Sequence, residues 1–328
     1  MSKILVTGAN GFIGQSLCKV LAAQNKFVRG IVRNKLPYDT NDNIEYFPIG
    51  DINFETNWMN LLSDIDCVIH CAGKAHFIEK KNAISEQTYK SINLEGTKQL
   101  AIQSAKAGVK RMIFLSSIKV NGENTFDINS DQNFKKTFKK IYTHDDIPDP
   151  KDFYGLSKWH AEKELQKISS KTDMEVTILR LPIVYGIGVK GNLRRLLNLV
   201  RSGVPLPFSM IKNQRSMIGL DNLIDLILIC TNHSAAAGKT FLVSDGEDLS
   251  TPSLIRCMAS SIGRTAKLFP LPISLLKATA YIFNKQDEIN KLVGSLKIDS
   301  SFTRETLNWY PKTNVSEGIK RMVQSQSF

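Results

Sequence analysis

A tyrosine and a lysine four positions apart form a pair that can carry out acid–base chemistry. Tyr154 and Lys158 lie in the segment Tyr154–Ser169, whose apolar spacing predicts a helix, so both side chains share one face. A phenol with its ordinary pKa of about 10 is a poor base at neutral pH, but a neighbouring cation stabilises phenolate. Tyr154 is therefore predicted to be a general acid/base whose pKa Lys158 lowers. Ser117, directly after the predicted strand Arg111–Ser116, is expected to bind a substrate oxygen opposite the tyrosine.

A glycine-rich turn joins the first predicted strand to the first predicted helix. Its sequence is Thr-Gly-Ala-Asn-Gly-Phe-Ile-Gly, at residues 7–14. Gly8 permits the tight turn, Gly11 lets backbone N–H groups approach a pyrophosphate, and Gly14 lets the helix pack closely on the strand. The turn predicts a dinucleotide cofactor.

The identity of that cofactor is predicted from the ends of the next two strands. A dinucleotide fold normally has an acidic residue after the second strand, where it binds the adenosine ribose. Here Arg33 follows the strand Phe27–Val32, and an arginine can bind a 2′-phosphate by a charge-assisted hydrogen bond. NADP is therefore favoured over NAD. Asp51 and Ile52 end the third strand, where a carboxylate can accept a hydrogen bond from the adenine amino group.

Short β-branched runs alternate with longer amphipathic runs along the first 180 residues. Because the strands are nearly all apolar, the alternation predicts an α/β fold, a Rossmann-type doubly wound parallel sheet covered on both faces. Ligands are expected beyond the carboxyl ends of its strands. The predicted strands are Lys3–Val6, Phe27–Val32, Ile44–Pro48, Cys67–Cys71, Arg111–Ser116 and Val176–Leu179, and the predicted helices are Phe12–Gln24, Phe54–Leu62, Glu86–Ala107 and Tyr154–Ser169.

The pattern changes after about Leu181, where glycine, proline and basic residues become frequent. The helix Asp221–Thr231 and the strand Thr240–Ser244 are predicted to return to the first domain, and the polar segment Gly122–Pro150 is predicted to be a surface excursion. The dinucleotide-binding domain is predicted at 1–180 plus about 216–245, and the substrate-binding domain at about 181–215 and 246–328.

The chain is basic, with 43 Lys and Arg against 31 Asp and Glu, a net charge of +12. The basic residues are scattered except for a run at 135–140 and the pair Arg194 and Arg195, and no zinc, RRM or helix-turn-helix signature accompanies them. We therefore expect no specific nucleic-acid partner.

The compartment is predicted to be the cytoplasm. The five cysteines include no CxxC pair, the N-terminus leads directly into a strand, and the histidines show no metal-ligand spacing, so no metal is expected. The apolar segment Leu268–Phe283 contains two prolines and is too short to cross a bilayer. We expect it to pack in the substrate domain or in a homodimer contact, with weak membrane-surface binding as the alternative.

The glycine turn, Ser117 and the Tyr154/Lys158 pair together resemble the extended short-chain dehydrogenase/reductase family, in its nucleotide-sugar epimerase/dehydratase branch. The resemblance implies that Tyr154 is the acid/base, that Lys158 binds the nicotinamide ribose and that Ser117 orients the substrate hydroxyl. The cofactor residues that the turn, the strand ends and the resemblance together indicate are Gly8, Asn10, Gly11, Phe12, Ile13, Gly14, Arg33, Asp51, Ile52, Cys71, Ala72, Gly73, Asn93, Tyr154, Lys158, Leu181, Pro182 and Val184.

The resemblance also implies a UDP-sugar substrate whose diphosphate is held by Asn192, Leu193 and Arg215. The closest similarity is to enzymes of bacterial O-antigen and capsule (lipopolysaccharide) synthesis that act at C4. The chain departs from the family in two places: Leu292–Leu296 replaces a late arginine segment, and the excursion Gly122–Pro150 is longer than usual.

Several activities are compatible with these residues. Arg33 favours reduction of a UDP-4-keto-6-deoxy-N-acetylhexosamine with NADPH. The alternative is a UDP-glucose or UDP-N-acetylglucosamine 4-epimerase with tightly held NAD, and a remote alternative is a non-catalytic NADP-sensing protein. A 4,6-dehydratase is disfavoured because Ile118 and Lys119, rather than an acidic pair, follow Ser117.

Overall fold

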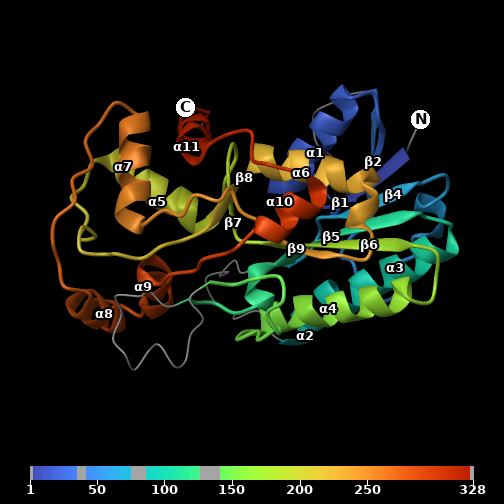
Figure 1. Cartoon of the computed structure of the whole chain (residues 1–328), viewed down its shortest axis with the longest axis horizontal. Coiled ribbons are helices and arrows are strands. Elements are labelled where there is room, and N and C mark those ends of the chain that lie inside the picture. Colours follow the sequence, from blue (N-terminus) through green and yellow to red (C-terminus); the bar gives the residue numbers. More distant parts are fainter. Residues whose placement is uncertain (1–2, 35–41, 75–85, 126–140, 326–328) are drawn as a thin grey trace.

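The computed structural model describes residues 3–34, 42–74, 86–125 and 141–325. Among them, seven parallel strands form one sheet in the order β3-β2-β1-β4-β5-β6-β9 (Figure 1). The strand order reverses between β1 and β4, as in a doubly wound Rossmann-type sheet, which confirms the predicted fold class. The strands are β1 (Lys3–Thr7), β2 (Phe27–Val32), β3 (Ile44–Pro48), β4 (Cys67–His70), β5 (Arg111–Ser117), β6 (Glu175–Leu181) and β9 (Thr240–Leu242).

Helices cover both faces of this sheet (Figure 1). Their apolar stripes bury Leu17 and Leu21 of α1 and Leu223 of α6 in one cluster with the sheet, and Leu100 of α3 and Leu165 of α4 in another. One layer contains α1 (Phe12–Ala23), α6 (Leu220–Asn232) and α10 (Ser301–Leu307), and the other contains α2 (Glu86–Tyr89), α3 (Thr97–Lys106) and α4 (Phe153–Ser169).

A separate apolar cluster forms beyond the end of the sheet. It is built on a two-stranded parallel pair and on helices that contribute residues such as Leu197, Met258 and Ile319. Its elements are β7 (Ile183–Tyr185), β8 (Met217–Gly219), α5 (Gly191–Ser202), α7 (Thr251–Ser261), α8 (Ile273–Ile282), α9 (Gln286–Val293) and α11 (Val315–Gln324).

The predicted helix Phe54–Leu62 is wrong, because the segment contains only a 3₁₀ turn at Met59–Leu61. Asn53 Oδ1 accepts a hydrogen bond from the Glu55 N–H (2.8 Å), and Asn57 Oδ1 accepts one from the Met59 N–H (3.1 Å). Asparagine side chains that bond to the backbone in this way compete with helical hydrogen bonding.

The predicted helix Glu86–Ala107 exists but is not uniform. A π-helical segment, Lys90–Gly96, separates α2 from α3. At Gly96 a Cβ atom would lie 2.6 Å from Ile52 Cγ2, so the helix approaches the end of the third strand more closely than any larger residue allows. Asn93 lies within this segment, and π-helical turns occur frequently at functional sites.

The ends of the excursion 122–150 are attached to a late segment of the chain. The Thr125 N–H donates to the Ser295 carbonyl (2.8 Å) and the Tyr142 N–H to the Lys297 carbonyl (2.9 Å). The basic run at 135–140 lies outside the described residues. Within the described residues, no helix is long and apolar enough to span a bilayer.

Candidate active site

The predicted catalytic residues Tyr154 and Ser117 are brought together at the carboxyl edge of the sheet. Asp152 accepts a hydrogen bond from the Gly155 N–H (2.7 Å) and so fixes the start of α4. At Gly155 a Cβ atom would lie 2.7 Å from the Lys119 carbonyl oxygen, which shows how closely α4 approaches the loop after β5. This approach brings the Ser117 side chain close enough to Tyr154 to lower the pKa of the phenol.

The expectation of a lowered pKa for Tyr154 is not met in this structure. Burial raises the pKa of the phenol to about 12, although the hydrogen bond from Ser117 opposes the shift. Lys158 does not offset the effect of burial on the pKa of Tyr154, since its Nζ donates to the Leu115 carbonyl (2.9 Å) and lies 4.5 Å from the centre of the Phe114 ring. The protein alone therefore holds Tyr154 protonated at neutral pH.

Lys158 is buried and lies beside the end of β4. A Cβ atom at Gly73 would lie 3.2 Å from Lys158 Nζ and 3.3 Å from Asn93 Oδ1, so only glycine leaves this side of the ammonium group open. Burial lowers the pKa of Lys158 to about 8, and the Glu162 carboxylate partly opposes the shift. Asn93 bonds to the Lys74 backbone (2.8 and 3.0 Å) and to Ser157 Oγ (3.1 Å), which connects the β4 end to α4.

Replacing Lys158 with methionine is expected to stabilise the cofactor-free protein by about 1–3 kcal/mol at pH 7. The pKa of Lys158 falls from 10.5 to about 8 on folding, so below pH 8 a charged group is buried at a cost. Between these two pKa values the unfolded chain binds more protons than the folded protein, so the stability of the wild type rises with pH. The stability advantage of Lys158→Met shrinks over the same pH range. Urea unfolding at pH 7 and pH 10 measures this.

The control for that experiment is Lys167→Met, which removes an exposed lysine from the same helix. It is expected to show little change in stability and no comparable pH trend. Equal stability of wild type and Lys158→Met at pH 7 would contradict the prediction.

The glycine-rich turn has the geometry of an anion site. Gly8 has a φ of +66° and its carbonyl accepts from the Gly11 N–H (2.8 Å). At Gly14 a Cβ atom would lie 2.2 Å from the Gly8 carbonyl oxygen, so no larger residue fits. Gly11 is the N-cap of α1 and has no side chain, so the first N–H groups of the helix face the place where a pyrophosphate would lie. These features fit a dinucleotide.

A buried hydrogen-bonded chain under this turn was missed by the sequence reasoning. Thr7 Oγ1 lies 2.6 Å from His70 Nδ1, and His70 Nε2 lies 2.9 Å from Thr97 Oγ1. Thr7 Oγ1 also accepts from the Ala72 N–H (3.1 Å). Burial lowers the pKa of His70 to about 3, so the ring is neutral and fixes β1, β4 and α3 to one another. The sequence feature that could have indicated this chain is a histidine at the end of an apolar strand.

Arg33 directly follows β2, whereas Asp51 lies three residues beyond the end of β3 rather than at the strand end as predicted, and the two side chains form an ion pair. Arg33 Nε lies 2.8 Å from Asp51 Oδ1, and both side chains are more than half exposed. Ile52 is buried against Gly96. A carboxylate at this distance from the guanidinium group opposes binding of a 2′-phosphate to Arg33, because it adds a negative charge beside the place where the phosphate would bind.

The remaining predicted cofactor residues lie at the same edge. Cys71 and Ala72 follow β4 and pack on the two sheet clusters, and burial raises the pKa of the Cys71 thiol. Pro182 separates β6 from β7, and Leu181 and Val184 pack in the cluster that contains α1. Asn10, Phe12 and Ile13 belong to the turn and the first turn of α1.

The predicted diphosphate residues lie on the neighbouring elements. Asn192 and Leu193 are in the first turn of α5, with Asn192 exposed and Leu193 buried. Arg215 Nη1 donates to the carbonyls of Lys291 (2.6 Å) and Gly294 (3.1 Å). The segment that replaces the late arginine therefore positions Arg215 through its backbone.

Arg215 also retains an unused donor. Its Nε is buried without a hydrogen-bond partner among the described residues, and burial lowers the pKa of its guanidinium group to about 10. A buried N–H group without an acceptor is costly, and an anionic oxygen atom would satisfy it. This orphaned donor fits a diphosphate ligand.

A second buried network lies behind the predicted catalytic residues, and the sequence reasoning also missed it. Arg180 and Glu162 form an ion pair of 2.6 Å, Nη2 to Oε2, and both are nearly inaccessible to solvent. Ser116 donates to Glu162, and Arg180 Nη1 donates to Asn121 Oδ1 (3.0 Å). The network joins β5, β6, α4 and the loop after Ser117, and thereby holds the strand end on which Ser117 lies.

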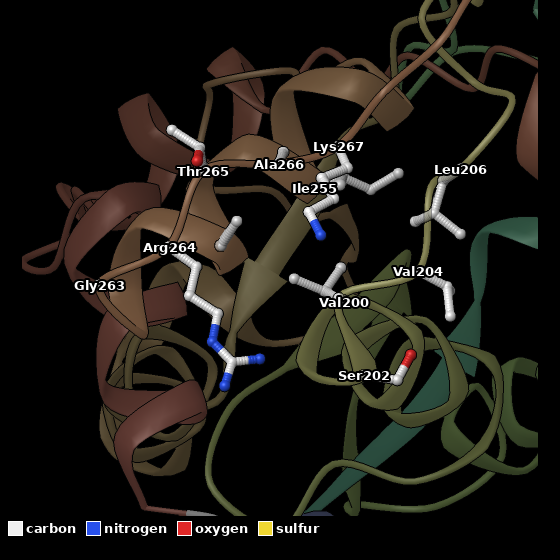
Figure 2. Close-up of a pocket in the computed structure, with 12 residues that line it drawn as sticks. Val200, Ser202, Val204, Leu206, Ile255, Gly263, Arg264, Thr265, Ala266 and Lys267 are labelled. Atoms are coloured by element: carbon white, nitrogen blue, oxygen red, sulfur yellow. The ribbon is translucent and has the colours of Figure 1, made fainter.

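A surface hollow of about 450 Å³ lies elsewhere, between the ends of α5 and α7 (Figure 2). It is lined by Val200, Leu206, Ile255, Arg264 and Lys267 among others. The Arg264 guanidinium donates to the Arg201 carbonyl (2.5 Å). The residues that line the hollow include none from the glycine turn and neither Tyr154 nor Lys158, so the hollow is separate from the candidate active site.

Comparison with known proteins identifies the family. The sequence profile of the NAD dependent epimerase/dehydratase family matches residues 4–244. The chain belongs to this family. The predicted resemblance, and with it the prediction of an enzyme, is confirmed.

Two relatives and one solved structure match this epimerase/dehydratase over most of their length. A UDP-glucose 4-epimerase from Vibrio cholerae is 41% identical over 324 residues, 98% of this chain and 94% of that protein. An N-acetyl-alpha-D-glucosaminyl-diphospho-ditrans,octacis-undecaprenol 4-epimerase from Escherichia coli O157:H7 is 27% identical over 294 residues, 89% of this chain and 81% of that protein. The structure of UDP-glucuronic acid 4-epimerase from Bacillus cereus in complex with NAD matches with a TM-score of 0.76 at 21% identity, covering 98% of each chain.

Proposed function

We propose that the protein is a UDP-sugar 4-epimerase that holds one NAD through both halves of its reaction. The observation that carries the proposal is that Lys158 Nζ lies 2.9 Å from the Leu115 carbonyl and beside Gly73, at the sheet edge where Ser117 is close enough to Tyr154 to lower its pKa. The 41% identity with a UDP-glucose 4-epimerase favours epimerisation over the reduction predicted from Arg33.

The roles of the side chains follow from their positions. Tyr154 takes the proton of the C4 hydroxyl group and later returns it, and Ser117 holds the same oxygen atom. Lys158 would bond to the nicotinamide ribose and would supply positive charge near the phenolate. NAD, when bound, supplies the group that accepts and returns the C4 hydride. The positive charges of Lys158 and of the cofactor are the forces that would lower the raised pKa of Tyr154.

The proposed binding of the substrate depends mainly on Arg215. Its orphaned Nε supports binding of the UDP diphosphate. The proposed division of the chain follows: residues 1–180 and about 216–245 bind NAD, and about 181–215 and 246–328 bind the UDP-sugar. The lipid-linked sugar in the name of the relative from Escherichia coli O157:H7 supports a role in bacterial surface polysaccharide synthesis.

The experiment combines cofactor identification with substrate interconversion. Purified protein is denatured and the released nucleotide is chromatographed, and separate samples are incubated with UDP-glucose, UDP-galactose and UDP-N-acetylglucosamine. We expect bound NAD and interconversion without net cofactor consumption. Consumption of NADPH with a UDP-4-keto-6-deoxy-N-acetylhexosamine, without interconversion of UDP-sugars, would establish the reductase instead.

The preference for NAD over NADP is expected to depend on the ion pair of Arg33 and Asp51. Asp51→Asn removes the carboxylate charge and frees the guanidinium group, so the affinity for NADP relative to NAD should rise by about fivefold to tenfold. Binding is measured by calorimetry on protein stripped of nucleotide. Glu45→Gln, at an exposed acidic residue of β3, is the control. An unchanged affinity for NADP in Asp51→Asn would show that the pair does not select the cofactor.

A further inference from the structure

The outer face of α8 is apolar although it is exposed. Leu276 and Ala280 point inward and are buried, whereas Leu275 is 51% exposed and Ile282 is 72% exposed. Residues 275, 278 and 282 fall on one side of a helix, so Leu275, Ala278 and Ile282 form a stripe. Three exposed large side chains follow one another at the end of this helix, namely Tyr281, Ile282 and Phe283.

This face carries a concentration of large apolar side chains. Leu275, Tyr281, Ile282 and Phe283 lie within nine residues and each is at least half exposed. Elsewhere the comparably exposed Phe54 and Tyr310 lie in unrelated segments of the chain. Figure 1 places α8 at the end of the molecule furthest from the parallel sheet, so a flat surface can approach it without touching the sheet.

The charge around α8 is positive. Residues 249–286 contain five basic residues and no acidic residue. Lys277 lies on α8 itself and Lys285 follows it, and both are exposed. The next acidic residues are Asp287 and Glu288 in the first turn of α9, and Glu288 is paired with Arg195 and Lys285 (3.3 Å each). The five basic residues, all exposed, are Arg256, Arg264, Lys267, Lys277 and Lys285.

We propose that α8 and the residues after it, 275–285, bind the surface of an anionic lipid bilayer. An interfacial helix combines an apolar face that enters the boundary of the acyl chains with lysines that reach anionic headgroups. Tyr281 and Phe283 are aromatic side chains of the kind that favours this boundary. The ten residues of α8 lie in the plane of the surface, since about 20 are needed to cross it. This binding is independent of the proposed enzymatic function.

The test is flotation with vesicles at low salt. We expect the whole protein to float with vesicles of equal phosphatidylcholine and phosphatidylglycerol, and to bind far less to phosphatidylcholine alone. Ile282→Ser with Phe283→Ser should lower the partition coefficient by at least about tenfold. Lys277→Gln and Lys285→Gln should each lower it by about fivefold.

The matched control is Phe54→Ser with Tyr310→Ser, which removes two large exposed side chains elsewhere, 61% and 60% exposed. These variants should float like wild type, and all variants should keep the wild-type circular dichroism spectrum. Wild-type protein that stays unbound, or equal losses in the control and α8 variants, would overturn the proposal. Conversion of a dimer to a monomer by the α8 variants, without vesicle binding, would assign the face to a second copy of the chain.

Discussion

Replacing Tyr154 with phenylalanine is expected to lower kcat of UDP-sugar interconversion by about 10²–10⁴-fold. The variant keeps the ring and its packing but loses the hydroxyl group that we propose exchanges the C4 proton. Initial rates with UDP-glucose and UDP-galactose measure the change.

The control for this substitution is Tyr89→Phe. The Tyr89 ring is 6.0 Å from the Tyr154 ring, so the variant removes a neighbouring phenol with the same change in volume. It is expected to retain activity within a few-fold of wild type. A Tyr154→Phe protein with wild-type folding and undiminished turnover would remove Tyr154 from its proposed role.

Replacing Arg180 with methionine is expected to lower the free energy of unfolding by about 3–5 kcal/mol. The substitution leaves the Glu162 carboxylate buried beside Ser116 without its cationic partner. The Asn121 side chain also loses a hydrogen-bond donor. Urea unfolding at pH 7 measures the loss.

Two further variants separate the buried charge from the loss of packing. The double variant Arg180→Met with Glu162→Leu removes both charges. Its loss of unfolding free energy should be smaller than the sum of the losses in the two single variants. Arg195→Met breaks the more exposed pair with Glu288 and should cost about 0–1 kcal/mol. Equal losses in Arg180→Met and Arg195→Met would show that burial does not give the first pair its importance.

The positions of the predicted site residues depended on local sequence to different degrees. Gly8, Gly11 and Gly14 could be predicted because a tight turn and a close helix require glycine whatever the rest of the chain does. Asp152, two residues before Tyr154, is an N-cap signal of the same local kind. The helix expected at Phe54–Leu62 failed because Asn53 and Asn57 offered the backbone other partners.

The long-range pairs could not be predicted in this way. Arg33 and Asp51 both follow strands, but whether they bind each other or a cofactor depends on the register of β2 and β3. Arg180 and Glu162, and Thr7 and His70, are joined across elements far apart in the chain.

The sequence by itself determined the alternation of strands and helices, the glycine turn and the shared face of Tyr154 and Lys158, because each depends on neighbours within a few residues. Only the tertiary structure decided the direction of the pKa shift of Tyr154, the orphaned donor of Arg215 and the exposed apolar face of α8. The reason is physical: desolvation, unsatisfied hydrogen bonds and exposure are set by what packs around a group, and those atoms come from distant parts of the chain.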